Sequence, residues 1–333
     1  MTYDLVIAYR IYPGISKNPV VCKNSKYDLA KLCIDSLSRS LSGIHYKVYA
    51  LMDNCPKEFD QLFTDAFGEE RVEFVRYNGI GNFATFAEQI RILSTQTESE
   101  YVYFAEDDYF YLDGQFHLML ECLKNKPNVD FLTVYGYTDS YYPFHNSNYN
   151  EFEYAGKLWK RTSSSCLTFL TTKTQLNAVK YCFKTFSKWS GDGSLWSGIT
   201  LGWSYFGLLK NFFKLTKVQR RVFVQMSLFF LPRFILNRKK NLYMATPSIG
   251  THMETGILAQ GVDWNKEINR YLESPVQICE EVHNMPNKIT TLKKIKNIIK
   301  ALDIIKHPLT IIPLVWIICC LLVIVLLVVM LIK

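Results

Sequence analysis

Three acidic residues stand side by side in the segment YVYFAEDD (101–108), directly after an apolar run. Neighbouring carboxylates repel one another, and the end of a buried strand is a costly place for them unless a cation is present. A hard divalent ion prefers oxygen ligands and is commonly held by one or two carboxylates together with substrate phosphates. Glu106, Asp107 and Asp108 therefore predict a site for Mg²⁺ or Mn²⁺ that carries a diphosphate, with a solvated acidic turn as the alternative.

Two other segments present single residues that suit chemistry. Asp192 lies between two glycines in GDGSLW (191–196), where the backbone can approach a ligand closely and neighbouring side chains do not crowd the carboxylate. The same residue would also serve as a helix N-cap, so both interpretations stay open. His252 lies in the Thr- and Gly-rich segment PSIGTHMETG (247–256) rather than on an apolar face, which favours a ligand role over a structural one.

The first 135 residues contain the elements that must position these side chains. We expect strands at 5–10, 46–53, 72–77, 101–108 and 129–134, and helices near 26–40, 56–67, 83–95 and 114–125. This alternation predicts an α/β fold with a mostly parallel sheet and helices on both faces. Ligands of such sheets bind beyond the carboxyl ends of the strands, where this chain carries Arg10, Asp53 and the three acids.

The segment EDDYFYLDGQF (106–116) resembles the acidic motif of GT-A fold glycosyltransferases, in the E-D-D variant of family 2-like enzymes. The likeness covers about residues 4–135 in order. It implies that Asp108 chelates the metal, while Glu106 and Asp107 face the ribose and the sugar. Residues 1–135 would then be the nucleotide-sugar-binding half of a GT-A domain, and the Tyr-rich, irregular stretch 136–285 would be the acceptor-side half of the same domain.

The resemblance extends to residues outside the acidic motif. It implies that Asp53 reads the nucleotide base. Arg10, at the exit of the first strand, is a further candidate for binding the nucleotide-sugar. GNFATFAEQIRIL (81–93) is similar to the donor-side helix, which makes Asn82 and Arg91 candidates for sugar or phosphate contacts. Taken alone, Asp53 is equally a turn former and Arg91 equally a solvated helical residue.

The same resemblance gives Asp192 and His252 their roles. Asp192 would be the general base that removes a proton from the acceptor hydroxyl, and His252 would complete the metal shell or touch the diphosphate. These roles describe a metal-dependent, inverting transferase of the hexosyl or N-acetylhexosaminyl type, with a UDP-sugar as the expected donor and a glycan or lipid-linked acceptor.

Two alternative functions have to be weighed against the same residues. A nucleotidyltransferase should show a Gly-rich, basic phosphate loop after the first strand, and RIYPGISKNP (10–19) supplies only Gly14 and Lys17. A sugar-binding module that kept the fold but lost the chemistry would not need to retain the three acids with Asp192 and His252.

The C-terminal part differs from the rest in composition. Six lysines and one acid lie between residues 288 and 307, so this stretch contributes part of the net charge of +8. Apolar residues recur at helical spacing in this stretch, so 286–307 predicts an amphipathic helix on an anionic membrane surface rather than a nucleic-acid site. Residues 309–332 contain no charge over 24 positions, whereas about 20 suffice to cross a bilayer, so 308–333 predicts a transmembrane anchor.

Several features favour a cytoplasmic catalytic domain on a single-pass, C-terminally anchored chain. The lysines next to the span stay on the cytoplasmic side by the positive-inside rule. The nine cysteines form no C-x-x-C pair, which is typical of a reducing compartment, and MTYDLVIAYR (1–10) does not resemble a secretory signal.

The stretch from 212 to 240 combines basic residues with the apolar run VFVQMSLFFLP (222–232). Gln225 and Pro232 interrupt the run, so it should not span a bilayer. We expect a buried helix or strand pair here, with a second membrane-contacting surface as the alternative.

Deleting residues 308–333 should release the protein from membranes. The predicted helix is about 36 Å long, enough to cross a hydrocarbon core of about 30 Å. The released chain should still bind its donor but use a lipid-linked acceptor poorly, because the high local acceptor concentration is lost. Sedimentation of membranes in high salt measures the release. Continued association of the truncated chain, or digestion of the catalytic domain by protease outside sealed cells, contradicts this topology.

Overall fold

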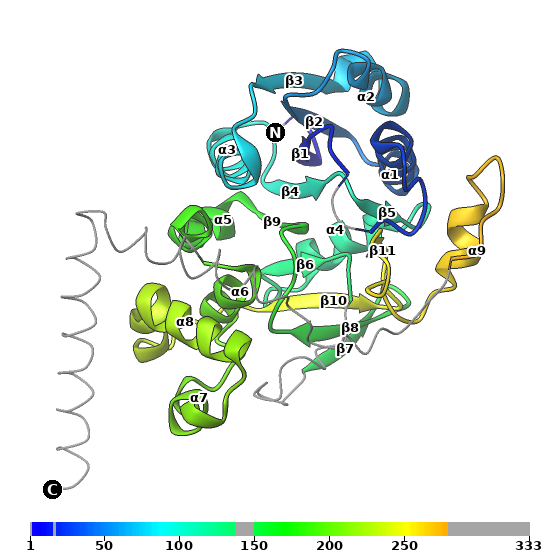
Figure 1. Ribbon diagram of the computed structural model, residues 1–333. Coiled ribbons are helices and arrows are strands. Elements are labelled where there is room, and N and C mark those ends of the chain that lie inside the picture. The colour runs from blue at the N-terminus through cyan, green and yellow to red at the C-terminus, as the bar shows by residue number, and fades with distance from the viewer. Residues whose placement is uncertain (1, 16–17, 137–149, 189, 279–333) are drawn as a thin grey trace, which may run out of the picture. The chain divides into compact units, whose positions relative to one another are not determined.

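The computed structural model describes residues 2–15, 18–136, 150–188 and 190–278, drawn in colour in Figure 1. All of them belong to one compact unit, Met1–Glu281. The predicted amphipathic helix at 286–307 and the predicted anchor at 308–333 lie outside the described residues. None of the helices in the described ranges has the length and apolar character that a bilayer crossing requires.

The predicted alternation of strands and helices in the first 135 residues is confirmed. The strands are β1 (Leu5–Ile11), β2 (Tyr46–Asp53), β3 (Val72–Tyr77), β4 (Tyr101–Glu106) and β6 (Phe131–Thr133), and the helices are α1 (Lys26–Ser40), α2 (Phe59–Phe67), α3 (Gly81–Thr95) and α4 (Phe116–Asn125). β3, β2, β1 and β4 are adjacent in that order and pair in parallel. Their carboxyl ends therefore meet at one edge of the sheet.

The described part of the sheet continues beyond β4 to nine strands, in the order β3-β2-β1-β4-β9-β6-β10-β8-β7. The added strands are β7 (Glu151–Tyr154), β8 (Lys157–Thr162), β9 (Phe169–Thr172) and β10 (Leu242–Thr246). β9 pairs antiparallel with both β4 and β6, and β8 pairs antiparallel with both β10 and β7. The two predicted halves of the chain thus share one mostly parallel sheet.

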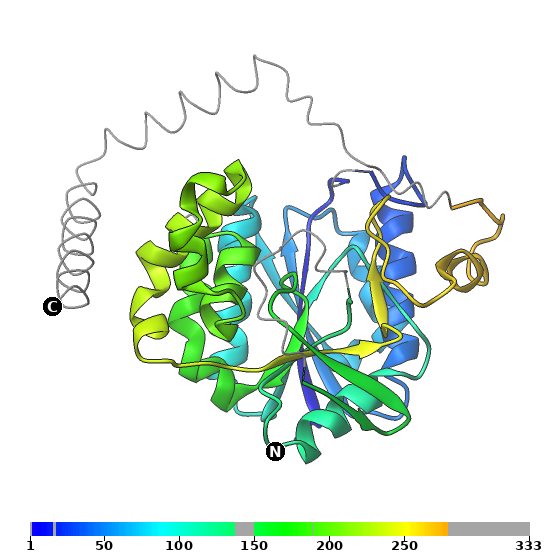
Figure 2. The same ribbon diagram turned by 90° about the horizontal axis from the view of Figure 1, so that it is seen from below.

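Each strand near the centre contributes side chains to two separate hydrophobic cores, because successive side chains point to opposite faces of the sheet. In β1, Leu5, Ile7 and Tyr9 pack with α1 and α2, whereas Val6 and Ala8 pack with α3 and α5 (Lys173–Phe183). Figure 2 shows α1 on one side of the sheet and α3 with the green helices on the other. The same alternation decides where the polar residues at the strand ends point.

A short second sheet joins two segments that are far apart in the sequence. β5 (Tyr109–Tyr111) follows the three acids, and it pairs antiparallel with β11 (Gly250–His252). Tyr109 is the register partner of His252, and the backbone N–H of Met253 donates to the Asp108 carbonyl oxygen at 2.8 Å. This pairing brings the PSIGTH segment beside the acidic motif.

The remaining helices form a layer on the α3 side. They are α6 (Asp192–Thr200), α7 (Tyr205–Lys210) and α8 (Lys217–Ile235). In Figure 1, α9 (Trp264–Asn269) lies apart from them. Short 3₁₀ turns occur at Glu69–Arg71, Lys184–Lys188 and Phe212–Lys214. The ambiguous stretch 212–240 is therefore mainly one helix, α8, with Pro232 inside it. Its Val222, Phe223, Met226 and Phe230 are buried.

Gly198→Ala is expected to destabilise the fold. A Cβ added at Gly198 of α6 would lie 2.2 Å from Cγ of Phe230 in α8. The overpacking should cost about 1–3 kcal/mol and outweigh the gain of about 0.5–1 kcal/mol from replacing a helical glycine. Urea unfolding measures the change. Gly191→Ala is the control, because nothing lies within 4 Å of its added Cβ; equal stability of Gly198→Ala and the parent chain would contradict the α6–α8 packing.

Candidate functional site

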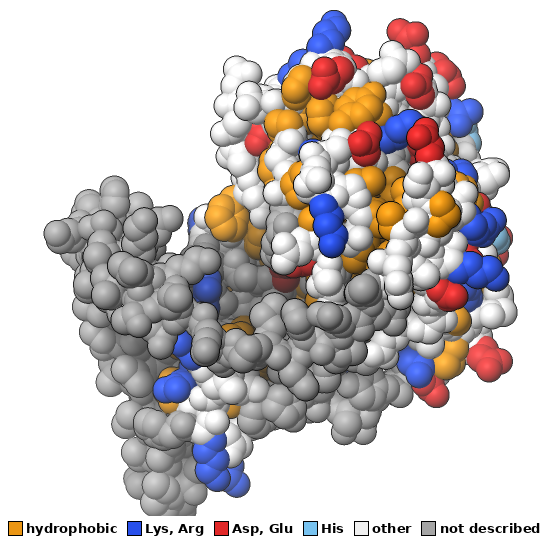
Figure 3. Space-filling view, turned by 45° about the vertical axis from the view of Figure 1, so that its right-hand side comes forward, with side chains coloured by type: hydrophobic (Ala, Val, Ile, Leu, Met, Phe, Trp, Pro, Cys, Tyr) orange, Lys and Arg blue, Asp and Glu red, His pale blue; other side chains and the backbone are white. Residues whose placement is uncertain are grey.

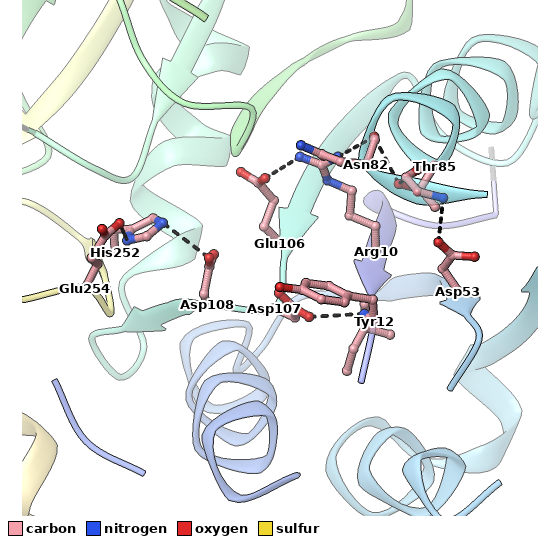
Figure 4. Close-up of a pocket in the computed structure, with 12 residues that line it drawn as sticks. Arg10, Tyr12, Asp53, Asn82, Thr85, Glu106, Asp107, Asp108, His252 and Glu254 are labelled. Atoms are coloured by element: carbon pink, nitrogen blue, oxygen red, sulfur yellow. Dashed lines mark hydrogen bonds and ion pairs between the residues drawn. The ribbon is translucent and has the colours of Figure 1, made fainter. Parts of the chain in front are cut away.

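A cavity of about 390 Å³ opens at the carboxyl ends of β1, β2 and β4 (Figure 4). Seven of the predicted site residues line it: Arg10, Asp53, Asn82, Glu106, Asp107, Asp108 and His252. Ile11, Tyr12, Gly81, Thr85 and Glu254 complete the lining. The structure therefore brings together residues that are up to 242 positions apart in the sequence, where a parallel sheet is expected to bind a ligand.

Arg10 and Glu106 form an ion pair on the α3 side of the cavity. They are register partners on neighbouring strands, so the pleat points both to the same face. The guanidinium also donates to the side chain of Asn82 and, at 3.0 Å, to its backbone carbonyl, and it lies over the Phe86 ring. Thr168 Oγ1 donates to the other Glu106 oxygen at 2.8 Å, so both carboxylate oxygens of Glu106 have partners.

Asp107 points to the opposite face, where α1 begins. Its Oδ2 lies 2.7 Å from Nζ of Lys26 and accepts from the backbone N–H of Tyr12 at 3.2 Å. Burial by itself would lower the pKa of Lys26, but Asp107 raises it above its ordinary value. Burial likewise raises the pKa of Asp107, and Lys26 opposes that effect. The pKa of Asp107 stays above its ordinary value, because burial outweighs the opposing effect of the nearby Lys26 ammonium group.

Asp53 ends β2 and holds the start of α3. Its two carboxylate oxygens accept from the backbone N–H groups of Ile80 and Gly81, each at 2.8 Å. These amides are among those at a helix N-terminus that have no partner within the helix. Asp53 therefore fixes the start of α3 and with it the position of Asn82, and both residues line the cavity.

Asp108 faces His252 and, beyond it, Glu254 (Figure 4). Nε2 of His252 lies 3.2 Å from Oδ2 of Asp108, and Nδ1 lies 3.7 Å from Glu254. Burial would raise the pKa of Asp108, but His252 outweighs it and lowers the pKa to about 2. For His252, burial acts to lower the pKa, yet Asp108 raises it above the ordinary value. Each group thus shifts the pKa of the other in the direction that favours the charged pair.

The donor set around Asp108 fits a divalent cation that takes further ligands from its substrate. A carboxylate and an imidazole suit Mn²⁺, and such ions are often held by one or two carboxylates plus phosphates. Oδ1 of Asp108 and Nδ1 of His252 are buried and make no hydrogen bond among the described residues. Within the same residues, no group of three or more His, Cys, Asp and Glu side chains is arranged to hold a metal ion.

Asp192 is not among the residues that line this cavity. It is the first residue of α6, and Gly191 occupies the N-cap position that the sequence also allowed for Asp192. Burial raises the pKa of the Cys166 thiol, and Asp192, Glu106 and Asp108 all raise it further. The three carboxylates therefore act on one buried group.

Arg91 is the one predicted donor contact on α3 that does not reach the cavity. It is exposed and pairs with Glu88 at 2.8 Å. Arg91 follows Asn82 by nine residues, which is half a turn out of phase at 3.6 residues per turn, so the two side chains leave opposite sides of the helix.

Sequence reasoning missed Lys26, Tyr12, Thr85 and Glu254. Glu254 had a local signal, since it follows His252 by two residues in a segment already singled out. Lys26 had none, because a lysine at the start of an amphipathic helix ordinarily lies in water, whereas here it is 5% exposed.

No family model matches the chain, and neither does any curated protein. Among solved structures, the chain is similar to residues 1–349 of TarS from S. aureus, with 12% identity, a TM-score of 0.38, and coverage of 56% of this chain and 55% of that one. A mannosyltransferase from Pyrobaculum calidifontis, in complex with GDP-Man and Mn²⁺, matches with 10% identity, a TM-score of 0.29, and coverage of 40% and 35%. A cytidylyltransferase from Leptospira borgpetersenii matches with 10% identity, a TM-score of 0.31, and coverage of 54% and 64%.

All three TM-scores are below 0.5. The chain spans about half the length of the TarS segment that it matches.

Lys26→Met should lower the free energy of unfolding by about 3–5 kcal/mol, because it leaves the buried Asp107 carboxylate without its cation. Adding Asp107→Asn to this variant should recover part of the loss, since no unpaired charge then remains. Urea unfolding of the two variants measures both effects. Lys23→Met, at an exposed position of the same segment, is the control. A Lys26→Met chain as stable as the control would show that the ion pair does not hold this side of the site.

Proposed function

We propose that this chain is a metal-dependent glycosyltransferase that moves a sugar from a nucleotide-sugar to an acceptor. The observation that carries the proposal is the placement of Asp108 and His252, 3.2 Å apart, in a cavity that also contains the Arg10 guanidinium. An anionic ligand would meet a fixed cation on one side and a candidate metal site on the other. The resemblance of the E-D-D segment to GT-A enzymes supports the same function.

The simplest test is hydrolysis of nucleotide-sugars to free nucleotide when Mn²⁺ is added. Release of the nucleoside diphosphate supports sugar transfer. Formation of pyrophosphate from a nucleoside triphosphate and a sugar phosphate would identify a nucleotidyltransferase instead. Neither reaction would be expected of a sugar-binding module without catalysis.

The donor would lie along the cavity from Asp53 to Asp108. Asp53, already oriented by two backbone amides, is placed to accept from a nucleotide base, and we expect a UDP-sugar. Asn82 and Glu106 engage only part of the five N–H donors of Arg10, which leaves donors for a phosphate. Glu106 remains a candidate contact for the ribose or sugar. Asp107 is paired with Lys26, so its main contribution would be to orient the turn that carries Asp108.

Asp108 and His252 would hold Mn²⁺ or Mg²⁺ together with the donor diphosphate. When bound, such an ion neutralises the charge that grows on the leaving diphosphate. His252 must lose its proton to become a ligand, and Asp108 offers the buried oxygen that makes no hydrogen bond among the described residues. Arg10, on the opposite side, would steady the same leaving group without any change of protonation.

Asp192 would act as the general base on the acceptor hydroxyl. Its position at the start of α6, near Cys166 and outside the donor cavity, agrees with a group that meets the acceptor rather than the nucleotide. A single displacement assisted by this carboxylate would invert the configuration at the anomeric carbon. The sugar would be of the hexosyl or N-acetylhexosaminyl type.

The acceptor would be a glycan or a lipid-linked glycan at the cytoplasmic face of a membrane. This part of the proposal depends on the composition of residues 286–333, where six lysines precede an uncharged run. An enzyme anchored there meets membrane-bound acceptors at high local concentration.

Asp108→Asn should lower turnover by at least about 100-fold, because it keeps the shape of the side chain but removes the charge that holds the cation. Donor hydrolysis and transfer over a range of Mn²⁺ concentrations measure the loss. Asp113→Asn, on an acid outside the cavity, is the control. Near-normal turnover of Asp108→Asn at low Mn²⁺ would exclude Asp108 as a principal ligand.

Asp192→Asn should lower transfer by roughly 10²- to 10⁴-fold and leave donor affinity nearly unchanged, because a general base acts on the acceptor. Steady-state transfer and donor titration by calorimetry separate the two effects. A parallel loss of donor affinity would instead make Asp192 a donor contact or a structural residue.

A further inference from the structure

The segment between Asp192 and Glu254 contains no acidic residue. Over these 61 positions there are nine lysines and arginines, and no aspartate or glutamate. Two of the nine are engaged inside the fold: Arg233 is buried and donates to backbone carbonyls of α6, and Lys240 pairs with Asp130. The other seven are exposed, so this segment presents positive charges and no negative charge of its own.

The exposed side of α8 combines these charges with apolar side chains. Exposed large apolar residues are few in the described chain, and five of the ten lie between 209 and 236. Ile235 is 62% exposed and Leu236 is 60% exposed, although both belong to a helix end that packs on its other side. Apolar area of this kind is unfavourable in water unless something covers it.

The residues of this surface lie on one side of the helix. At 3.6 residues per turn, Lys217, Arg220, Val224 and Ile235 fall within about 60° of one another, opposite the buried Met226. Together with Lys214 and Leu236 they form what we call the α8 surface. The basic residues lie in or before the first turn of α8, Val224 lies near its middle, and Ile235 and Leu236 lie at its end.

The basic residues of the α8 surface have no acidic partner among the described residues. No ion pair joins Lys214, Lys217 or Arg220 to an aspartate or glutamate there. In Figure 3, acidic and basic side chains alternate over the upper part of the visible face, whereas only basic ones are visible in the described part at the lower left. Figure 3 is turned about the vertical axis only, so α7, the lowest described element in Figure 1, also lies low in Figure 3.

We propose that the α8 surface binds a membrane containing anionic lipids. An interfacial helix lies with apolar side chains at the acyl boundary and basic ones at the headgroups, which is the combination found here. Its charge is complementary to an anionic leaflet, where each lysine or arginine strengthens binding about fivefold. The inference rests on described residues alone and does not depend on the predicted anchor or on sugar transfer.

Tryptophan quenching in the full chain tests this contact. Ile235→Trp is bound to vesicles of phosphatidylcholine and phosphatidylglycerol whose acyl chains carry bromine, and the signal of the unsubstituted chain is subtracted. Val276→Trp is the matched control, since Val276 is 41% exposed and lies outside the α8 surface. The tryptophan at 235 should be quenched and the one at 276 should not.

A second pair of variants tests the role of charge. Lys217→Gln with Arg220→Gln, added to Ile235→Trp, should lower the ratio of bound to free α8 surface by roughly thirtyfold and thereby relieve the quenching. Lys23→Gln with Lys57→Gln, on exposed lysines elsewhere, should leave it unchanged. The proposal is overturned by no quenching at 235, by equal quenching at 235 and 276, or by quenching that both charge pairs affect alike. An α8 surface that binds a second copy or a nucleic acid gives the first of these results.

Discussion

Three carboxylates can share the end of β4 only because each is given a partner from a different element. The pleat sends Glu106 toward α3 and Asp107 toward α1, and the turn leaves Asp108 facing β11. Their partners are, in order, Arg10 with Thr168, Lys26 with a backbone amide, and His252. Without this separation, mutual repulsion and desolvation would raise the pKa of the acids and favour neutral groups. The order of strands and helices thus matters for the electrostatics of the site, because it gives each acid its own partner.

This arrangement leaves the acids unequal. Both oxygens of Glu106 accept hydrogen bonds or ion pairs, and Asp107 is fixed by a buried lysine, so neither is easily turned toward a cation. Asp108 keeps one buried oxygen without a hydrogen bond among the described residues, next to an imidazole that becomes a ligand when it loses its proton. The chemistry proposed for the motif therefore concentrates on its last residue, and the first two act mainly by positioning it.

Local patterns predicted most of the fold of the first 135 residues. The strands and helices up to Thr133 follow apolar periodicity, which one sequence displays directly, and the strand exits then indicated Arg10, Asp53 and the acids. The pairing of strands that are distant in the sequence could not be predicted. No local pattern near Phe169–Thr172 indicates that β9 pairs antiparallel with both β4 and β6. The burial of Lys26 depends on the same kind of distant contact. The placement of Arg91 was predictable from helical phase, because it lies half a turn from Asn82.

The central claim is that the cavity at the ends of β1, β2 and β4 binds a nucleotide-sugar and a divalent cation together. Thermal unfolding of the full chain in one detergent, with a panel of nucleotide-sugars in Mn²⁺ or in a chelator, tests this claim most directly. A ligand at about 100 times its Kd adds roughly 2.7 kcal/mol to the free energy of unfolding. We predict that at least one nucleotide-sugar raises the Tm in Mn²⁺ and fails to do so in the chelator. Stabilisation by none of them, or equal stabilisation with and without the cation, would contradict the account.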